Sequence, residues 1–433
     1  MQLASSLLPS SSPAAGIVGA TSNASSLFTD ISTHFKNYWW VYLLILVLIG
    51  VGVGLYVYFS RAAKASAAAN DKVTSQLAAA AAAKKDEGSA KPLEGFQVQG
   101  DGRTPDPIEN SDKTLINIQA LSIKDTGFIG PYPTGKYDEE DATAKVLKAG
   151  FRFLTLQVDY LDTEKNPTLF AEPGVPTLLI RSPTKSLLSG NSGNIQSVAS
   201  AIANVGFRPE VPNSLQPIVL YIHVNSTPDP VKSPEKYLDF LSQIARQLNP
   251  LAPVHLGLSA SGNYTRQKLE RELLMTPLDT YNGQVIIMSN VDTSLFRNRS
   301  YTTYAPAEDL DFWVNIRVYL QDAADVLGVS SIAPNSVTPA AVVADLKRIL
   351  GITGTLTQTF AANAKDTFTI AMPDRATNPT PADFKNALDN YGINAIPIDI
   401  FSDTPENVIQ MASEYNNMSY FPKPAAQRVN RPV

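Results

Sequence analysis

Two stretches of this 433-residue chain decide its fold class: Gly150-Phe-Arg-Phe-Leu-Thr-Leu-Gln-Val158 and Gln216-Pro-Ile-Val-Leu-Tyr-Ile-His-Val224. Each contains a short apolar run of the length of a buried β-strand. The intervening residues 195–202 place Ile, Val and Ala at spacings of three and four, which predicts an amphipathic helix. A strand, a helix and another strand in succession indicate parallel pairing through a right-handed crossover.

The same alternation extends in both directions from these two stretches. Further strands are predicted at residues 115–121, 177–180, 255–258, 285–288, 312–320, 368–372 and 395–400. Eight or nine strands between residues 111 and 430 predict the α/β class, as a (β/α)8 TIM barrel with an insertion around residues 291–366. A doubly wound open sheet is the alternative that this pattern leaves open.

Several helix boundaries are visible in the sequence as short residue patterns. At four places a hydroxyl residue that can cap a helix stands directly before a proline at the first helical position. These pairs are Ser233-Pro234, Thr338-Pro339, Thr380-Pro381 and Thr404-Pro405. Gly351 and Gly392 stand where helices are expected to end, because glycine is the residue preferred just after a helix.

Upstream of the predicted barrel, residues 39–59 form an apolar run without a charged residue or a proline. At about 1.5 Å per residue such a helix reaches about 30 Å, the thickness of the hydrocarbon core of a bilayer. Aromatic residues, which favour membrane interfaces, stand at both ends of the run. They are Trp39, Trp40 and Tyr42 on one side and Tyr56, Tyr58 and Phe59 on the other. We therefore predict one transmembrane helix, and a buried core helix or a cleaved signal peptide fits less well.

The segments around this span differ in composition from the barrel. Residues 1–38 form a tail rich in Ser and Ala, and residues 60–110 form a linker rich in Ala and Lys. Lys36 is the one basic residue before the span, whereas Arg61, Lys64 and Lys72 follow it closely. The positive-inside rule predicts a single-pass membrane protein with the tail outside and the barrel on the cytosolic side.

Composition excludes several kinds of site and partner. The chain has no cysteine, which excludes disulfides and thiolate metal sites. Its net charge of −5 and the lack of a basic stripe give no indication of nucleic-acid binding. No P-loop, nucleophile elbow, zinc motif or dinucleotide fingerprint is found.

The order of motifs resembles that of the phosphatidylinositol-specific phospholipase C family, whose catalytic domain is a TIM barrel. The stretch ending at Val158 is similar to the family's second strand, and the stretch ending at Val224 is similar to its fourth. The closing strand and the terminal motif of the family are matched by Tyr391-Gly-Ile-Asn-Ala-Ile-Pro397 and Met418-Ser-Tyr-Phe-Pro-Lys-Pro-Ala-Ala-Gln-Arg428. The resemblance implies a phosphodiesterase barrel with its active site at the C-terminal ends of the strands.

The expected catalytic positions depart from the family pattern. The family uses two histidines, one as a general base and one on the phosphate, and some members add acidic calcium ligands. In this chain the first histidine position is matched by Gln119 and the second by Arg181. The acidic positions of the second strand are matched by Thr155 and Gln157, and that of the fourth strand by His223.

These replacements change the chemistry that the resemblance implies. Neither an amide nor a guanidinium accepts a proton near neutral pH, and calcium requires six to eight oxygens, several of them from carboxylates. We therefore expect no cofactor and an inactive barrel. Asp292 follows the predicted strand 285–288 and is a further catalytic candidate, because catalytic residues of such barrels lie at strand ends.

Three functional hypotheses follow. The first is a membrane-anchored, inactive barrel with a structural or interaction role. Its composition is similar to that of barrel proteins of large DNA viruses, so a virion membrane component that contacts bilayer, capsid or other membrane proteins is its most concrete form. The second is an active phosphoric diester hydrolase on phosphoinositides or glycerophosphodiesters, with His223, Arg181 and Asp292 in a rearranged site and calcium as its metal. The third is a module that binds phospholipid headgroups through Arg181 and His223.

Overall fold

The computed structural model describes residues 103–129, 136–161, 174–180, 192–259, 261–266, 269–298, 304–321, 339–373, 378–400 and 405–429. The predicted membrane span, the tail and most of the linker lie outside these ranges. Among the helices within them, none has both the length and the apolar character that crossing a bilayer requires. The membrane span at residues 39–59 therefore stays a prediction.

Seven parallel strands follow one another around the central sheet. In spatial order they are β2 (Ser122–Ile123), β5 (Phe153–Asp159), β7 (Ile218–Val224), β8 (Val285–Ser289), β9 (Ile316–Leu320), β10 (Ala341–Asp345) and β11 (Phe368–Met372). Residues 395–398 supply the eighth position, because parallel bridges join Ala395 to Ile370 and Ile398 to Ile123. The ring is closed, which confirms the predicted (β/α)8 barrel and excludes the open sheet.

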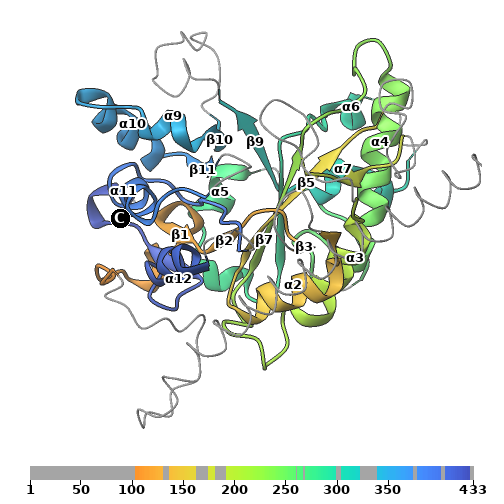
Figure 1. Ribbon diagram of the computed structural model, residues 1–433. Helices are drawn as coiled ribbons and strands as arrows, with labels where there is room; N and C mark the ends of the chain where they lie inside the picture. Colours follow the sequence, from red (N-terminus) through yellow and green to blue (C-terminus); the bar gives the residue numbers. More distant parts are fainter. Residues whose placement is uncertain are drawn as a thin grey trace, which may run out of the picture. The chain divides into compact units, whose positions relative to one another are not determined.

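Helices cover the outside of this ring (Figure 1). They are α2 (Glu139–Lys148), α3 (Ile195–Val205), α4 (Pro234–Gln247), α5 (Glu270–Met275), α6 (Ser294–Asn298), α7 (Leu310–Trp313), α9 (Leu346–Leu350), α10 (Thr355–Lys365), α11 (Pro381–Asn390) and α12 (Pro405–Ser413). Pro234, Pro381 and Pro405 each begin a helix, as predicted, and the Thr380 hydroxyl caps α11 by accepting from the Asp383 amide.

Two hydrophobic clusters divide the core according to the alternation of strand side chains. On β5, Phe153 belongs to the cluster inside the ring, while Leu154 and Leu156 belong to the cluster between the strands and the helices. On β7 the inner cluster contains Val219 and Tyr221. This alternation assigns an inward direction to every second residue of each strand and so determines which side chains line the barrel.

Two sequence predictions about barrel strands and one about a helix start are wrong. Residues 177–180 contribute only β6 (Thr177–Leu178), which pairs antiparallel with the end of β5 and lies outside the ring. At residues 255–258 there is no strand, because the 3-10 helix Asn249–Val254 comes directly before and His255 makes a single bridge to Val285. The pair Thr338-Pro339 begins no helix: β10 follows, since its Ala-Val-Val-Ala run is buried between β9 and β11.

The range 291–366, in which we expected an insertion, contributes β9 and β10 to the ring. Both strands of this range therefore belong to the ring, whereas the predicted strand 177–180, observed as β6, lies outside it. As predicted, Gly351 directly follows α9, and Gly392 follows Tyr391, the C-cap residue of α11. Gly392 has the positive φ of 67° that favours glycine.

A short antiparallel pair closes the N-terminal end of the barrel. It joins β1 (Ile118–Ala120) to β12 (Tyr420–Pro422). Beside it, the buried side chain of Asn394 donates to the carbonyls of Leu115, Ile116 and Ile118 at 2.9–3.1 Å. Its Oδ1 accepts from the Thr369 amide at 2.9 Å and from Nζ of Lys423 at 3.0 Å. One side chain thus connects the first, seventh and eighth strand regions with the C-terminal segment.

Lys423 is fully buried at this closed end, and the desolvation of its ammonium lowers its pKa to about 7. In the unfolded chain a lysine holds its proton up to a pH of about 10.4. Between these values the unfolded state binds more protons, so Lys423 makes the free energy of unfolding rise with pH by up to about 1.4 kcal/mol per pH unit.

We predict that Lys423→Met flattens this rise between pH 7 and 10 in urea unfolding experiments. The exposed Lys148→Met is the matched control and keeps the wild-type slope. Equal slopes in wild type and Lys423→Met would contradict the assigned titration of Lys423.

Candidate functional site at the barrel mouth

The C-terminal ends of the parallel strands meet at one end of the ring, which we call the mouth. Lys124, Asp125 and Thr126 follow β2, and Asp159 ends β5. Across β7 the register places Gln157 beside His223 and Thr155 beside Tyr221. By alternation from Phe153 and Val219, these four side chains point into the barrel.

Asp125 is held by the strand next to it. Its Oδ1 accepts a hydrogen bond from Nε2 of Gln157 at 2.5 Å, and both side chains are buried. The Thr126 amide donates to the Thr155 carbonyl at 2.9 Å, which fixes the same turn to β5. Asp125 therefore joins the mouth ends of the first and second barrel strands.

Asp159 performs the same function between the second and third barrel strands. This buried carboxylate accepts from Nδ2 of Asn225 at 3.1 Å and from Oγ of Ser226 at 3.0 Å. The Asn225 amide also donates to the Val158 carbonyl. Both donors come from the segment that follows β7, so Asp159 connects the ends of β5 and β7.

The third and fourth barrel strands are connected by an amide. Asn290 follows β8, and its side chain accepts from the Val224 amide at 2.7 Å and donates to the Val224 carbonyl at 2.9 Å. It therefore continues the β7–β8 ladder by one step beyond the last strand residue. Three successive strand ends of the mouth are thus fastened by Asp125, Asp159 and Asn290.

His223 is the histidine nearest to this set. Its Nδ1 lies 2.8 Å from the hydroxyl of Tyr221, and burial raises the pKa of that hydroxyl above its usual value. A tyrosine that keeps its proton can donate it to Nδ1, and the neutral imidazole then carries its own proton on Nε2. In this tautomer Nε2 is a hydrogen-bond donor and not a general base.

Four buried polar atoms of the first two barrel strands have no hydrogen-bond partner in the described part of the chain. They are the hydroxyl oxygens of Ser122, Thr126 and Thr155 and Oε1 of Gln157. Buried polar atoms are normally satisfied by protein or by water. Since Ser122, Thr155 and Gln157 share the inward direction, the upper barrel interior provides polar atoms for small polar molecules or water.

The carboxylate of Asp292 is held in place by the start of α6 and by an arginine. Its Oδ1 accepts from the Ser294 amide at 2.9 Å at the start of α6 and lies 3.2 Å from Nη1 of Arg317. Partial burial raises the pKa of this carboxyl, but the hydrogen bonds from Ser294 and the charge of Arg317 outweigh it and keep the pKa below its usual value. Asp292 is therefore ionised at neutral pH and is not a general acid.

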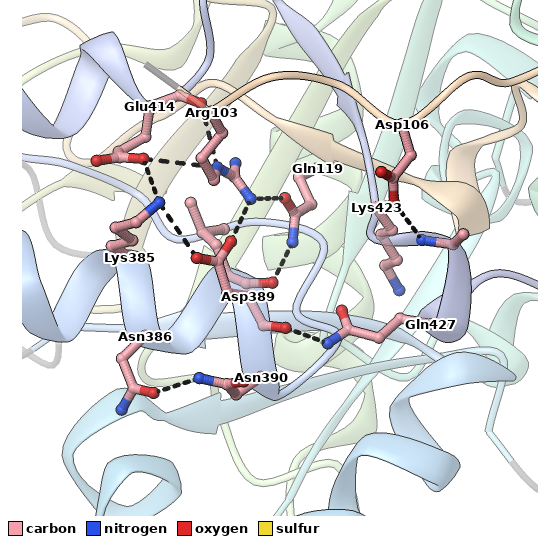
Figure 2. A network of polar contacts seen from close by, with 12 residues as sticks. Arg103, Asp106, Gln119, Lys385, Asn386, Asp389, Asn390, Glu414, Lys423 and Gln427 are labelled. Atoms are coloured by element: carbon pink, nitrogen blue, oxygen red, sulfur yellow. Dashed lines mark hydrogen bonds and ion pairs between the residues drawn. The ribbon is translucent and has the colours of Figure 1, made fainter. Parts of the chain in front are cut away.

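Gln119 lies at the opposite end of the barrel, so the prediction that it belongs to the mouth is wrong. It sits on β1, where its Oε1 accepts from Nη1 of Arg103 at 2.7 Å and its Nε2 donates to the Leu388 carbonyl at 2.7 Å (Figure 2). Arg103 also pairs with Asp389 at 3.1 Å. The register Ser122–Phe153 shows that Lys124, and not Gln119, stands at the mouth end of the first strand.

Arg181 lies outside the described residues, so its predicted phosphate or headgroup contact stays a prediction. Arg266 has a structural environment, because its guanidinium pairs with the buried carboxylates of Asp309 and Asp311. His255 contacts the Trp313 carbonyl at 2.8 Å, and burial lowers its pKa to about 4. It is a neutral structural histidine near the start of β8.

In the described ranges, no group of three His, Asp or Glu side chains is arranged to hold a metal ion. Sequence reasoning assigned no site role to Asp125 or Asp159. Asp159 directly follows the predicted strand 151–158, whereas Asp125 comes four residues after the predicted strand 115–121, and the partners of both depend on the register between strands.

The chain resembles several solved structures. PLC21 of L. pealei matches with 16% identity and a TM-score of 0.47 over 74% of this chain, and PLC21 of S. officinalis with 17% identity and a TM-score of 0.46 over 74%. The match spans 38% of the length of each PLC21 chain. A calcium-dependent phosphatidylinositol-specific phospholipase C from Streptomyces antibioticus matches with 12% identity and a TM-score of 0.39, over 72% of this chain and 99% of that one.

No protein-family model matches the chain, and no curated protein matches it in sequence. The name of the Streptomyces protein is that of the family whose motifs the sequence resembles. The barrel itself is established by the strand order and ring closure of this chain.

We predict that Asp159→Ala lowers the free energy of unfolding by about 2–3 kcal/mol, because it removes a buried carboxylate that accepts hydrogen bonds from Asn225 and Ser226. Urea unfolding measures this change. Asp239→Ala on the exposed face of α4 is the control and should change stability by less than about 0.5 kcal/mol. A loss as small as that of the control would contradict a fastening role for Asp159.

Proposed function

We propose that the chain is a membrane-anchored, phospholipase-C-like barrel that does not hydrolyse phosphodiesters and acts as a structural or interaction protein. The observation that carries this proposal is the use of the mouth carboxylates. Asp125 and Asp159 are bound by side chains of the neighbouring strand ends, at 2.5 Å and 3.0–3.1 Å, and so hold the mouth together.

His223 and Asp292, the two candidates for acid–base chemistry that lie in the described part of the chain, support the same proposal. A general base has to accept a proton at working pH, and a general acid has to hold one. His223 contacts a tyrosine hydroxyl that keeps its proton, and Asp292 is held ionised by Ser294 and Arg317. In this arrangement His223 does not act as a general base, and Asp292 does not act as a general acid.

Anchoring of the barrel rests on the apolar run at residues 39–59 and its aromatic ends. With this anchor, the role of the protein is to hold the barrel at a membrane surface, where its outer face and mouth are available to other proteins. A position between a virion membrane and a capsid shell is the most specific form of this proposal.

A second function, phosphodiester hydrolysis, is favoured by one observation. Gln157 and His223 are register neighbours on β5 and β7, and Asp125 contacts Gln157, so an imidazole, an amide and a carboxylate gather at the mouth. In this alternative His223 would be the general base, which requires the other imidazole tautomer.

The test is an activity assay on the full chain in lipid nanodiscs. Vesicles of phosphatidylinositol and a glycerophosphodiester are supplied with and without calcium, and released headgroup is measured. We expect no release above that of protein-free nanodiscs. Turnover that His223→Ala abolishes, and that the exposed Lys148→Ala prepared in the same way retains, would overturn the proposal in favour of the hydrolase.

A further inference from the structure

A hollow of about 440 Å³ lies at the N-terminal end of the barrel, away from the mouth. Its walls come from segments that precede strands: residues 110–113 before β1, residues 209–216 before β7, and residues 278–282 before β8. Tyr420 of β12 also lines the hollow. This volume lies in the range of small-molecule sites, which hold about 300–1,000 Å³.

The lining carries one charge of each sign. Lys113 and Asp279 stand on adjacent segments, because the Leu278 amide donates to the Lys113 carbonyl at 2.9 Å. Within the described part of the chain, neither side chain makes a hydrogen bond or an ion pair. Because the two charges cancel, the hollow favours neither an anion nor a cation over a neutral ligand.

The remaining polar lining consists of amides and a hydroxyl. Asn110, Ser214 and Asn282 contribute side chains for which the described residues provide no hydrogen-bond partner. Asn213 is fixed by donating to Oγ of Ser419 at 2.8 Å, which leaves its side-chain oxygen as an acceptor. Each amide offers a donor and an acceptor, and this combination matches hydroxyl groups, which also do both.

Gln216 provides a second, independent observation. Its Oε1 is buried, yet it has no hydrogen-bond partner in the described ranges. A ligand in the hollow reaches this oxygen once the half-buried Gln216 side chain turns toward it, and the hydrogen bond then removes the cost of about 1–3 kcal/mol that an unsatisfied buried acceptor carries. Val211, Pro212 and Leu278 supply apolar walls beside it, which suit the carbon face of a ring.

From this lining we propose that the hollow binds a neutral, hydroxyl-rich ring, namely a sugar residue, with Gln216 and Asn282 as hydrogen-bonding partners. The ring comes either from a free monosaccharide or from a glycan on another molecule. This inference does not depend on the proposed function, since the hollow and the mouth lie at opposite ends of the barrel.

The experiment measures ligand binding to the full chain, held in a detergent without a sugar headgroup, by saturation-transfer difference NMR. The probes are glucose, N-acetylglucosamine, and a core oligosaccharide released from an N-glycoprotein. We expect a dissociation constant on the order of 1 mM, as for a small polar ligand. Equal affinity for monosaccharide and oligosaccharide indicates a free sugar as the source, and tighter binding of the oligosaccharide indicates a glycan.

Two variants test the site itself. Gln216→Leu removes the buried acceptor and should weaken binding at least tenfold without lowering the melting temperature of the sugar-free protein, because the acceptor has no partner to lose. Asn282→Ala, at an exposed position, should weaken binding as well. It therefore tests whether the sugar binds in the hollow even if Gln216→Leu does not fold. Gln196→Leu on the exposed face of α3 is the matched control and retains binding.

Either of two results overturns the proposal. The first is the absence of saturation transfer to any of the three probes at about 10 mM, or a signal that both site variants leave unchanged. The second is stronger binding of inorganic phosphate than of the sugars, lost in Lys113→Ala, which would assign the hollow to an anion.

Discussion

The barrel depends on one buried side chain, the amide of Asn394. A ring of parallel strands has to join its last strand to its first, and here the joint is made by short segments with few backbone hydrogen bonds. Asn394 adds five contacts at this joint: three donated to carbonyls between Leu115 and Ile118, and two accepted from Thr369 and Lys423. Since each is buried, losing the amide would leave several backbone groups unsatisfied at once.

The two ends of the barrel use their polar residues in different ways. At the closed end, Arg103 binds Gln119 and Asp389 (Figure 2). It also stacks on Phe421, so the last part of the linker is attached to the C-terminal strand region. At the mouth, where enzymes with this fold place their catalytic groups, the buried carboxylates connect neighbouring strands. The carboxylates of the mouth are therefore explained by stability, while the closed end contains a polar hollow whose lining has no such explanation.

The sequence predicted the strands that are long apolar runs, and these are β5, β7, β8 and β11. It did not predict β10, because Thr338-Pro339 resembles a helix start and only burial between two strands decides against it. The site was less predictable than the fold. Which residue of the first strand reaches the mouth depends on the register with β5, and the contact of Asp159 with Asn225 joins residues 66 positions apart. Neither the register between strands nor this long-range contact can be predicted from local sequence patterns.

Hydrogen exchange tests the closure of the ring most directly. In the full chain, the amides of Lys124 and Ile398 cross the joint, and the amide of Leu220 lies in the middle of β7. If the joint is part of one cooperative barrel, peptides over residues 118–124 and 394–400 exchange as slowly as the peptide over 218–224. Asn394→Ala should then accelerate exchange at the joint by a hundredfold or so before it affects β7. Fast exchange at the joint in the wild type, or no acceleration in Asn394→Ala, would contradict a ring closed by this amide.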